Sequence, residues 1–434
     1  MSGPIKILIG LRDWVDARFP LMRIWNEHLA KYYAPKNFNF WYFFGAFALL
    51  VLGIQVITGI WLTMNYKPSA EEAFASVEYI MRDTEWGWLI RYMHSTGASA
   101  FFIVIYLHMF RALLYGSYKK PRELLWLSGM ALYLLLMGEA FFGYLLPWGQ
   151  MSYWGAQVII SLFGALPIIG DDLSLWIRGD FVVSDVTLNR FFSLHVIAFP
   201  LLILGLVGFH ILALHEVGSN NPDGIEIKNN KDEKGVPLDG IPFHPYYTVK
   251  DLMGAAVFLI FFFAVVFFAP EMKVPGTQGL FLESANFIQA NPLQTPEHIA
   301  PVWYFTPFYS ILRAVPPLFN SQFPGVAAMG LSVLIFFFVP WLDKSKVRSI
   351  RYKGALYKKW LSTFVISFIV LGYLGTVPSN VWGQFYNAIP IIGGKDVATI
   401  IARIFTVTYF LFFILMPIYS KKDITKSVPK RVRM

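Results

Sequence analysis

Long apolar stretches alternate with shorter polar connections along this 434-residue chain. Eight of the stretches carry almost no charge and come close to the length, about 20 residues, that an α-helix needs to cross a bilayer. They are residues 41–64, 92–110, 124–148, 191–214, 252–270, 323–342, 360–377 and 397–419. A ninth stretch, 155–169, is shorter and is interrupted by Gly164 and Pro167, so we expect it to lie in the interface or to pack on other helices. The pattern predicts an all-α, polytopic membrane protein with eight transmembrane helices.

Composition and charge support this prediction. With 56% hydrophobic and 15% charged residues, the chain is too apolar for an ordinary soluble core. Residues 1–38 lack the pattern of a signal peptide and suggest an amphipathic surface helix, so we expect the first span to be retained. The connections on the N-terminal side hold 26 basic residues and those on the other side hold 8. Because basic residues concentrate on the cytoplasmic side of membrane proteins, this asymmetry predicts cytoplasmic termini. It also accounts for the net charge of +9, which therefore does not indicate a nucleic-acid partner.

Four of the eight histidines lie inside two of the predicted spans. His94 and His108 are 14 residues apart, which is close to four helical turns and about 21 Å of rise, so their side chains face the same way. His195 and His210 are 15 apart, an overshoot of about 60°, for which we expect local unwinding near Pro200. One intramembrane histidine is commonly a packing residue, but two matched pairs predict two stacked bis-histidine sites of the kind that bind b-type haem. The absence of cysteine excludes iron–sulfur ligation, disulfides and covalent c-type haem from this chain.

Two other predicted spans each carry a pair of glycines with the same 14-residue spacing as His94 and His108. A flat macrocycle needs neighbours without side chains, although close helix packing also uses glycine. Arg91 and Arg111, three residues outside His94 and His108, could bind haem propionates or simply extend to the membrane interface. The glycines, paired 14 residues apart, are Gly45 with Gly59 and Gly129 with Gly143.

Five motifs carry a resemblance to a known family. They are "RYMHSTGASAFFIVIYLHMFR", "GYLLPWGQMSYWGAQVI", "NRFFSLH", "LHEVGSNNPDG" and "NPLQTPEHIAPVWYFTPFYSILRAVP". Together they resemble cytochrome b, the membrane core of quinol:cytochrome c oxidoreductase, from about residue 20 to about residue 420. Because the chain continues past residue 250, it is more similar to the respiratory form than to the split photosynthetic one.

The resemblance implies a homodimer in a bacterial inner membrane, with lipid around it. Each subunit would join a Rieske iron–sulfur protein and a membrane-anchored c-type cytochrome. Quinol would be oxidised near the outer face; one electron would go to the Rieske cluster, and the other would cross two non-covalent b haems to reduce quinone near the inner face. We therefore expect an N-terminal cytoplasmic segment (1–38), a dihaem four-helix domain (39–216), a cytoplasmic loop (217–250) and a C-terminal four-helix domain (251–434) that carries the quinol-site loop 295–316.

The resemblance also implies the haem residues. His94 and His195 would hold the outer, low-potential haem, and His108 and His210 the inner, high-potential haem. Further contacts would be Gln55, Gly59, Arg91 and Gly143 at the outer haem, and Gly45, Arg111, Ser117 and Gly129 at the inner haem.

An inner quinone site is implied by His215, Ser219, Lys250 and Asp251. Quinone reduction takes up two protons, and a histidine and an aspartate on facing helices are suitable donors. Asp251 could instead only stabilise the first turn of its helix, and Lys250 could be a topology charge.

The outer quinol site contains one departure from the family pattern. The familiar loop motif has glutamate as its second residue, a proposed proton acceptor, and here that residue is Val302. Glu139, within a span and one turn from Gly143, is the preferred replacement, because a carboxylate at that depth is costly without a function. Glu297 is the alternative. The other implied residues of the site are Met137, Phe141, Tyr144, Gly155, Pro301, Trp303 and Tyr304.

Two other classes of protein remain open from the residues alone. One is a dihaem b subunit of another quinone-linked oxidoreductase. The other is a secondary transporter that relays protons through Glu139 and Asp251. A reduced-minus-oxidised visible spectrum separates them, since a transporter would show no b-type haem. The quinone species and the role of the charged insertion 223–241 stay open.

Overall fold

The structure, a computed structural model, describes residues 3–273, 279–376 and 397–433. Within those ranges, seven helices are long and apolar enough to cross a membrane, and an eighth span results if a pair of helices bent by 60° is counted as one. The expectation of eight spans is confirmed on that count. The spans are formed by α3 (Phe43–Thr63), α5 (Gly87–Tyr115), α6 (Glu123–Leu145), α9 (Asp185–Ser193) with α10 (Phe199–Val217), α11 (Thr248–Phe268), α13 (Phe323–Leu334) with α14 (Val339–Leu342), α15 (Ala355–Thr376), and the bent pair α17 (Val397–Ile414) and α18 (Met416–Lys422).

The bend in the last span has a local cause. Pro417 stands in the first turn of α18, where its missing N–H removes a helical hydrogen bond to the preceding turn. Residue 377 and Lys395, which the sequence placed at the end of the seventh span and in an outer connection, lie outside the described residues.

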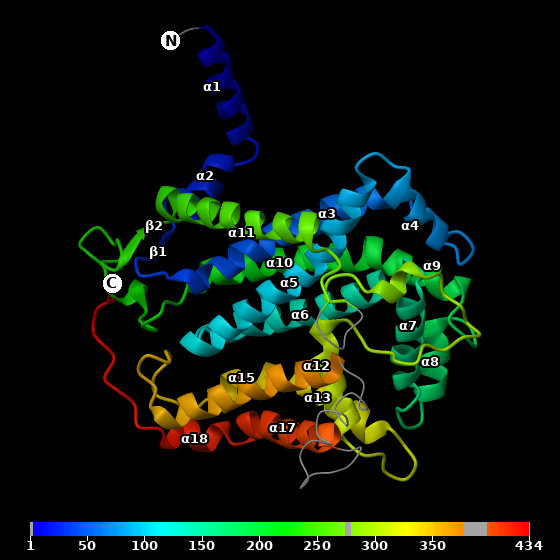
Figure 1. The fold of residues 1–434 in the computed structure, drawn as a ribbon. Coiled ribbons are helices and arrows are strands. Elements are labelled where there is room, and N and C mark those ends of the chain that lie inside the picture. Colours follow the sequence, from blue (N-terminus) through cyan, green and yellow to red (C-terminus); the bar gives the residue numbers. More distant parts are fainter. Residues whose placement is uncertain (1–2, 274–278, 377–396, 434) are drawn as a thin grey trace.

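The spanning helices form two groups (Figure 1). In the first group α3 packs on α5 and α10 packs on α6. In the second, α15 packs on α17 and on the short α12 (Thr306–Ala314), which also contacts α13. Helix α11 lies against α3 and α5, and its Gly254 leaves room for the ring of Phe43. By packing, the first group therefore extends beyond residue 251, the boundary expected from the sequence.

Shorter helices gather at the end of the molecule opposite to the chain termini, which we call the outer end (Figure 1). They are α4 (Ala73–Arg82), α7 (Gln150–Phe163), α8 (Gly170–Arg178) and the start of α9. The ninth apolar stretch thus forms most of α7, whose buried Tyr153, Ala156 and Ile160 pack in a small core with Leu145 at the end of α6. The prediction of a helix packed on others is confirmed.

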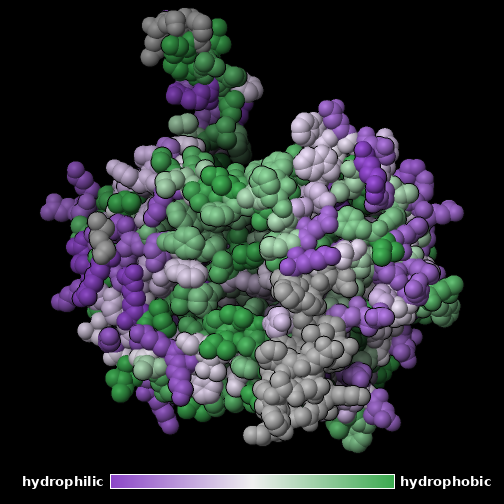
Figure 2. Space-filling view, viewed as in Figure 1, coloured by the Kyte–Doolittle hydropathy of each residue, from purple (hydrophilic) through white to green (hydrophobic). Residues whose placement is uncertain are grey.

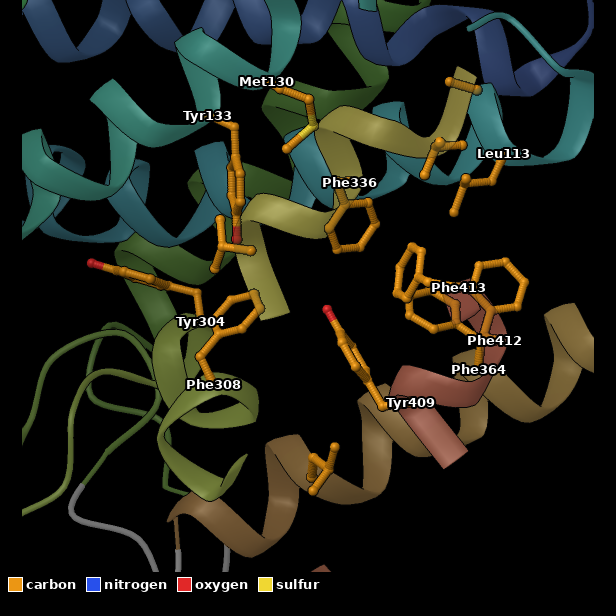
Figure 3. Packing of buried hydrophobic residues seen from close by; sticks show 14 of the residues in the cluster. Leu113, Met130, Tyr133, Tyr304, Phe308, Phe336, Phe364, Tyr409, Phe412 and Phe413 are labelled. Carbon is orange, nitrogen blue, oxygen red and sulfur yellow. The ribbon is translucent and has the colours of Figure 1, made fainter. Parts of the chain in front are cut away.

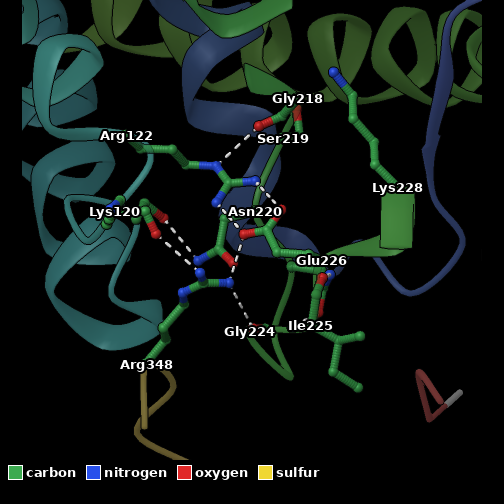
Figure 4. A network of polar contacts seen from close by, with 12 residues as sticks. Lys120, Arg122, Gly218, Ser219, Asn220, Gly224, Ile225, Glu226, Lys228 and Arg348 are labelled. Atoms are coloured by element: carbon green, nitrogen blue, oxygen red, sulfur yellow. Dashed lines mark hydrogen bonds and ion pairs between the residues drawn. The ribbon is translucent and has the colours of Figure 1, made fainter. Parts of the chain in front are cut away.

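The opposite, inner end is held by buried ion pairs (Figure 4). Arg122 donates to both carboxylate oxygens of Glu226, at 2.5 and 2.9 Å, and to the carbonyl of Gly218 at 2.9 Å. Arg348, which follows the sixth span, binds the same carboxylate and the carbonyl of Lys120 at 2.9 Å. Three inner connections are therefore joined at one glutamate of the insertion 223–241.

Asp239, from the same insertion, joins both ends of the chain to it. Its carboxylate lies 3.0 Å from Lys36 Nζ and 2.7 Å from Arg431 Nε. Next to it, strand β1 (Tyr33–Pro35) pairs antiparallel with β2 (Gly240–Pro242). The two terminal segments and the 217–250 connection lie on one side of the molecule, as the even number of spans predicted.

Aromatic side chains fill the space between the two helix groups (Figure 3). Tyr409, Phe412 and Phe413 of α17 and Phe364 of α15 belong to one buried cluster with Tyr133 and Met130 of α6. The outside is apolar as well: hydrophobic residues occupy the middle of the face in Figure 2, and hydrophilic ones gather toward the inner and outer ends. This distribution is the one expected for a protein surrounded by lipid.

Candidate functional site

Each of the four intramembrane histidines lies against one of the four register glycines. A β-carbon built on Gly59 would lie 3.2 Å from His94 Cε1, and one built on Gly143 only 2.3 Å from His195 Cε1. The other two pairs have the same arrangement toward the inner end: Gly45 with His108 at 3.4 Å, and Gly129 with His210 at 3.2 Å. The glycines thus make room for the imidazoles themselves, an arrangement that the sequence register indicated only indirectly.

A π-helical turn absorbs the extra residue between His195 and His210. It covers Leu194–Ala198 (η3) and leads into α10. Pro200 has no N–H to donate to the carbonyl of Val196, which favours a wider turn at this point. Because a π-turn holds one more residue than an α-turn, both imidazoles face α6 at matching levels, and the expectation of local unwinding is confirmed.

Hydrogen bonds at Nδ1 fix the tautomer of three of these histidines. Thr58 Oγ1 donates to the carbonyl of Ile54, so it accepts from His94 Nδ1 at 2.9 Å. Ser128 Oγ accepts from His210 Nδ1 at 2.9 Å in the same way, because its own proton is donated to the carbonyl of Leu125.

His195 Nδ1 lies 2.9 Å from the carbonyl oxygen of Glu139 and 3.1 Å from that residue's Oε1, both of which are acceptors. In all three cases the lone pair is left on Nε2, the nitrogen that would bind a metal. His108 has a long contact of 3.4 Å from Arg111, which fixes no tautomer.

The outer pair fits a metal bound between two imidazoles. Metal bonds to imidazole nitrogen are about 2 Å long, so two rings on opposite sides of one ion have centroids roughly 6 Å apart. The ring centroids of His94 and His195 are 6.1 Å apart. No cluster of three or more His, Cys, Asp or Glu occurs in the part of the chain that the structure describes, so two-histidine ligation of haem iron suits the residues present.

Unpartnered buried atoms occur beside both histidine pairs. Gln55 Nε2 and Glu139 Oε2 at the outer pair, and Arg111 Nε at the inner pair, form no hydrogen bond among the described residues. Polar atoms of this kind are expected to have partners when a site is filled. Arg91 stands one helical turn before His94 on α5, as predicted.

One cavity connects the inner histidine pair with the predicted inner quinone residues. Within the lining of this cavity, Arg111 donates to Ser117 Oγ at 3.4 Å, and its guanidinium lies over the ring of Tyr42. The lining includes every residue that the sequence placed at the inner sites, namely Gly45, His108, Arg111, Ser117, Gly129, His210, His215, Ser219, Lys250 and Asp251.

Tyr32 of the N-terminal segment organises the quinone end of this cavity, and the sequence did not indicate it. Its ring stacks on His215 with centroids 4.6 Å apart, and its hydroxyl accepts from the backbone N–H of Ser219 at 3.2 Å. Lys250 donates to the carbonyl of Phe38 at 2.9 Å. Tyr32 and Phe38 of the N-terminal segment therefore lie against the site to which His215 and Lys250 belong.

A second, larger cavity of about 940 Å³ opens at the outer end between α6, α7, α12 and α13. This volume falls within the range of small-molecule sites, about 300–1,000 Å³. Four residues expected at the quinol site line it: Met137, Phe141, Gly155 and Pro301. Leu194, which precedes His195 in the chain, lines it too. Lining residues that the sequence did not indicate include Ile299, Phe305, Phe308, Tyr309 and Met329.

Several predicted quinol-site residues lie behind this wall instead of on it. The ring of Tyr304 stacks on Phe102 with centroids 3.9 Å apart, and the indole of Trp303 donates to Ser99 Oγ at 3.1 Å. Both rings therefore turn toward α5, where burial is gained, and neither lines this cavity. Val302 packs against the same core.

The two candidate carboxylates do not line the cavity either. Glu139 holds its carboxylate against His195 Nδ1, on the face of α6 that also carries Gly143. Glu297 is exposed. A third carboxylate, Glu283, was missed by the sequence analysis: it is 8% exposed and accepts a short hydrogen bond from the hydroxyl of Tyr144.

Comparison with known proteins places both parts of the chain in one family. The description "Cytochrome b/b6/petB" matches residues 29–218, and "Cytochrome b(C-terminal)/b6/petD" matches residues 289–410. The first match covers all four histidines and the second covers the loop that contains Pro301 and Val302.

Similar proteins of known name align over nearly the whole chain. "Cytochrome b" of Allochromatium vinosum is 62% identical over 424 residues, 97% of this chain and 97% of the relative. "Cytochrome b" of Rhodospirillum rubrum is 46% identical over 417 residues, 96% of this chain and 94% of the relative. A solved structure described as "Hyperthermophilic respiratory Complex III" is 38% identical, with a TM-score of 0.82, and the match covers 94% of this chain and 98% of that one.

Proposed function

This chain belongs to the cytochrome b family, and we propose that it is the quinol-oxidising and quinone-reducing core of its complex. Quinol is oxidised in the outer cavity; one electron goes to a Rieske iron–sulfur cluster, and the other crosses the two histidine pairs to reduce quinone at the inner cavity. Protons are released at the outer end and taken up at the inner end, so that the reaction transfers charge across the membrane.

The proposal includes the partners and the setting of such a complex. These are a Rieske iron–sulfur protein, a membrane-anchored c-type cytochrome and a second copy of this chain, within the lipid of a bacterial inner membrane. The similarity to a respiratory Complex III supports this assembly. The 26 to 8 distribution of basic residues supports an orientation with both termini in the cytoplasm.

One observation carries the proposal: an apolar cavity at the outer end includes Leu194, the neighbour of His195, in its lining, and a second cavity combines the inner histidine pair with His215 and Asp251. Bound haem would supply one-electron transfer at each pair. His94 and His195 would hold the outer group, and His108 and His210 the inner one.

The side chains that line each cavity suit the half-reaction proposed for it. The outer cavity is lined mainly by apolar side chains such as Met137, Phe141 and Phe308, which exclude water from a bound quinol ring. At the inner cavity, His215 and Asp251 are placed to deliver the two protons that a reduced quinone takes up.

A cavity-filling substitution tests the proposal. Gly155→Leu places a side chain in the outer cavity, and we expect it to reduce quinol:cytochrome c activity at least tenfold while both b-haem bands persist in the reduced-minus-oxidised spectrum. Gly208→Leu is the matched control, because Gly208 is exposed on α10 with no atom near its β-carbon position. Equal activity of the two variants, or a purified wild-type complex without b-type haem, contradicts the proposed function.

A further inference from the structure

The outer cavity of this protein lacks a carboxylate at the loop position where the familiar motif has glutamate. Val302 cannot take up a proton, and the carboxylate of Glu139 is held against His195 Nδ1 at 3.1 Å. Glu297 is exposed and does not line the cavity. Oxidation of quinol releases two protons, so another group near the cavity must accept one of them if the proposed function holds.

Glu283 is a buried carboxylate at this end of the molecule. It precedes η6 (Ser284–Phe287) in the connection between α11 and α12. One of its oxygens accepts from the hydroxyl of Tyr144 and, at 3.3 Å, from Asn286 Nδ2, which also donates to the Tyr144 oxygen at 3.1 Å. Among the described residues no Lys, Arg or His forms an ion pair with Glu283. A carboxylate buried without a cation is costly unless it exchanges a proton or serves another function.

Asn286 fixes the position of the hydrogen-bonded pair Tyr144 and Glu283. Asn286 Oδ1 accepts from the backbone N–H of Ser152 at 2.8 Å, which ties η6 to the first turn of α7. Gly149, just before α7, leaves the space that Asn286 occupies, since a β-carbon there would lie 2.6 Å from Asn286 Oδ1. Tyr144 and Glu283 therefore keep their geometry without help from side chains in the cavity.

Gly155 connects this pair with the cavity. It lines the cavity, and a β-carbon built on it would lie 3.6 Å from Cε1 of Tyr144. The ring of Tyr144 is thus separated from the cavity only by the space that a side chain at position 155 would fill. Its hydroxyl donates to Glu283.

We propose that Tyr144 and Glu283 carry one proton of the oxidised quinol out of the cavity and replace the glutamate missing at Val302. The inference rests on the proposed quinol oxidation. As the quinol O–H bond breaks, the Tyr144 oxygen accepts that proton and its own hydroxyl proton moves to the Glu283 carboxylate. Tyrosine ends neutral, glutamate becomes a carboxylic acid, and the quinol electrons go to the two one-electron acceptors of the proposed function. Glu283 then loses the proton toward the outer surface.

The ionisation of Glu283 suits this role. Burial raises its pKa to about 7, although the hydrogen bond from Tyr144 opposes the rise. A group with such a pKa is partly ionised near neutral pH and can both accept and release a proton, which is what a general base requires.

Amide substitution in the intact complex tests the proposal. We expect Glu283→Gln to lower the rate of quinol oxidation at pH 7 by about 10²-fold, within the range for loss of a general base, and to remove the rise of the rate between about pH 6 and pH 8. Tyr144→Phe lowers the rate similarly, and the double variant is no slower than the slower single variant. Glu271→Gln is the matched control, because Glu271 lies on the same connection as Glu283 and also accepts from a tyrosine, Tyr92, but is exposed. It leaves the rate unchanged.

A conservative variant separates a proton carrier from a merely structural residue. Glu283→Asp keeps a titratable carboxyl group, so it retains at least a tenth of the wild-type rate and the rise of the rate with pH, both of which Glu283→Gln loses. The spectrum of both haems stays unchanged in every variant. If wild type oxidises quinol and Glu283→Gln matches Glu271→Gln across the pH range, the inference is wrong while the proposed function stands. A wild-type complex that does not oxidise quinol contradicts the proposed function itself.

Discussion

The four glycines that face the histidines differ in how close an added β-carbon would come to the imidazole. This difference predicts which glycine-to-alanine substitution disturbs haem binding. A β-carbon at Gly143 would lie 2.3 Å from His195 Cε1, whereas one at Gly45 would lie 3.4 Å from His108 Cε1. Carbon atoms in good contact are about 3.5–4.0 Å apart. Gly143→Ala must therefore displace the imidazole of His195 by about 1 Å, and Gly45→Ala requires almost no movement.

The size of the effect follows from what holds His195 in place. Its Nδ1 is bonded to the carbonyl oxygen of Glu139 at 2.9 Å, so displacement strains or breaks that bond. Overpacking costs about 1–3 kcal/mol and a lost hydrogen bond about 1 kcal/mol more. The total of about 2–4 kcal/mol corresponds to roughly 30- to 1,000-fold weaker haem binding at the outer site.

A redox titration of the two b-haem bands measures the prediction. We expect Gly143→Ala to lose most of the lower-potential band and to keep the higher-potential one, and Gly45→Ala to keep both. Helix propensity does not confuse the comparison, because both substitutions replace glycine by alanine inside a helix. If the two variants lose the same amount of haem, the glycines do not act through contact with the imidazoles and the reasoning fails.

Three other perturbations have distinct signatures. Thr58→Val and Ser128→Ala remove the acceptors of the outer and inner imidazole N–H groups, and each should weaken only its own haem site, about 10- to 100-fold by titration with haem. Asp251→Asn should slow reoxidation of the reduced haems by quinone in rapid-mixing traces and leave quinol-driven haem reduction unchanged. Hydrogen bonds from Arg431 and Lys36 outweigh burial and lower the pKa of Asp239 from 3.8 to about 2, so its stabilisation, about 2 kcal/mol, is present above pH 4 and is lost as pH falls toward 2. The difference in melting temperature between wild type and Asp239→Asn should shrink over that interval.

The features that could be predicted from the sequence are those set by helical periodicity and hydrophobic length. His94 and Gly59 lie on different spans, yet each belongs to a pair 14 residues apart, and such pairs meet when straight helices pack side by side. The extra residue before His210 was visible as a broken period, and Pro200 indicated where it would be absorbed. These predictions depend only on positions along single helices.

Side-chain direction in the loops could not be predicted in this way. Trp303 and Tyr304 were expected to face the quinol because they are adjacent to Pro301 in a motif. Of these three residues only Pro301 lines the cavity, since the two rings are buried against α5. Which side of an irregular segment becomes the wall depends on the partner helix, and no short sequence pattern records that.

Glu283 illustrates a signal that the sequence did contain. It lies 139 residues from Tyr144, so their contact could not be inferred from spacing. The segment 274–312, however, contains no Lys or Arg at all, and a carboxylate in such a segment has no local cation to pair with. An exposed carboxylate needs no cation because water solvates its charge, and this is the case for Glu297 in the same segment. Burial removes that option for Glu283 and leaves a tyrosine and an asparagine as its only described hydrogen-bond partners. These neutral partners let the carboxyl group change its protonation state without losing an ion pair, and this is the property that the missing glutamate at position 302 would otherwise have to supply.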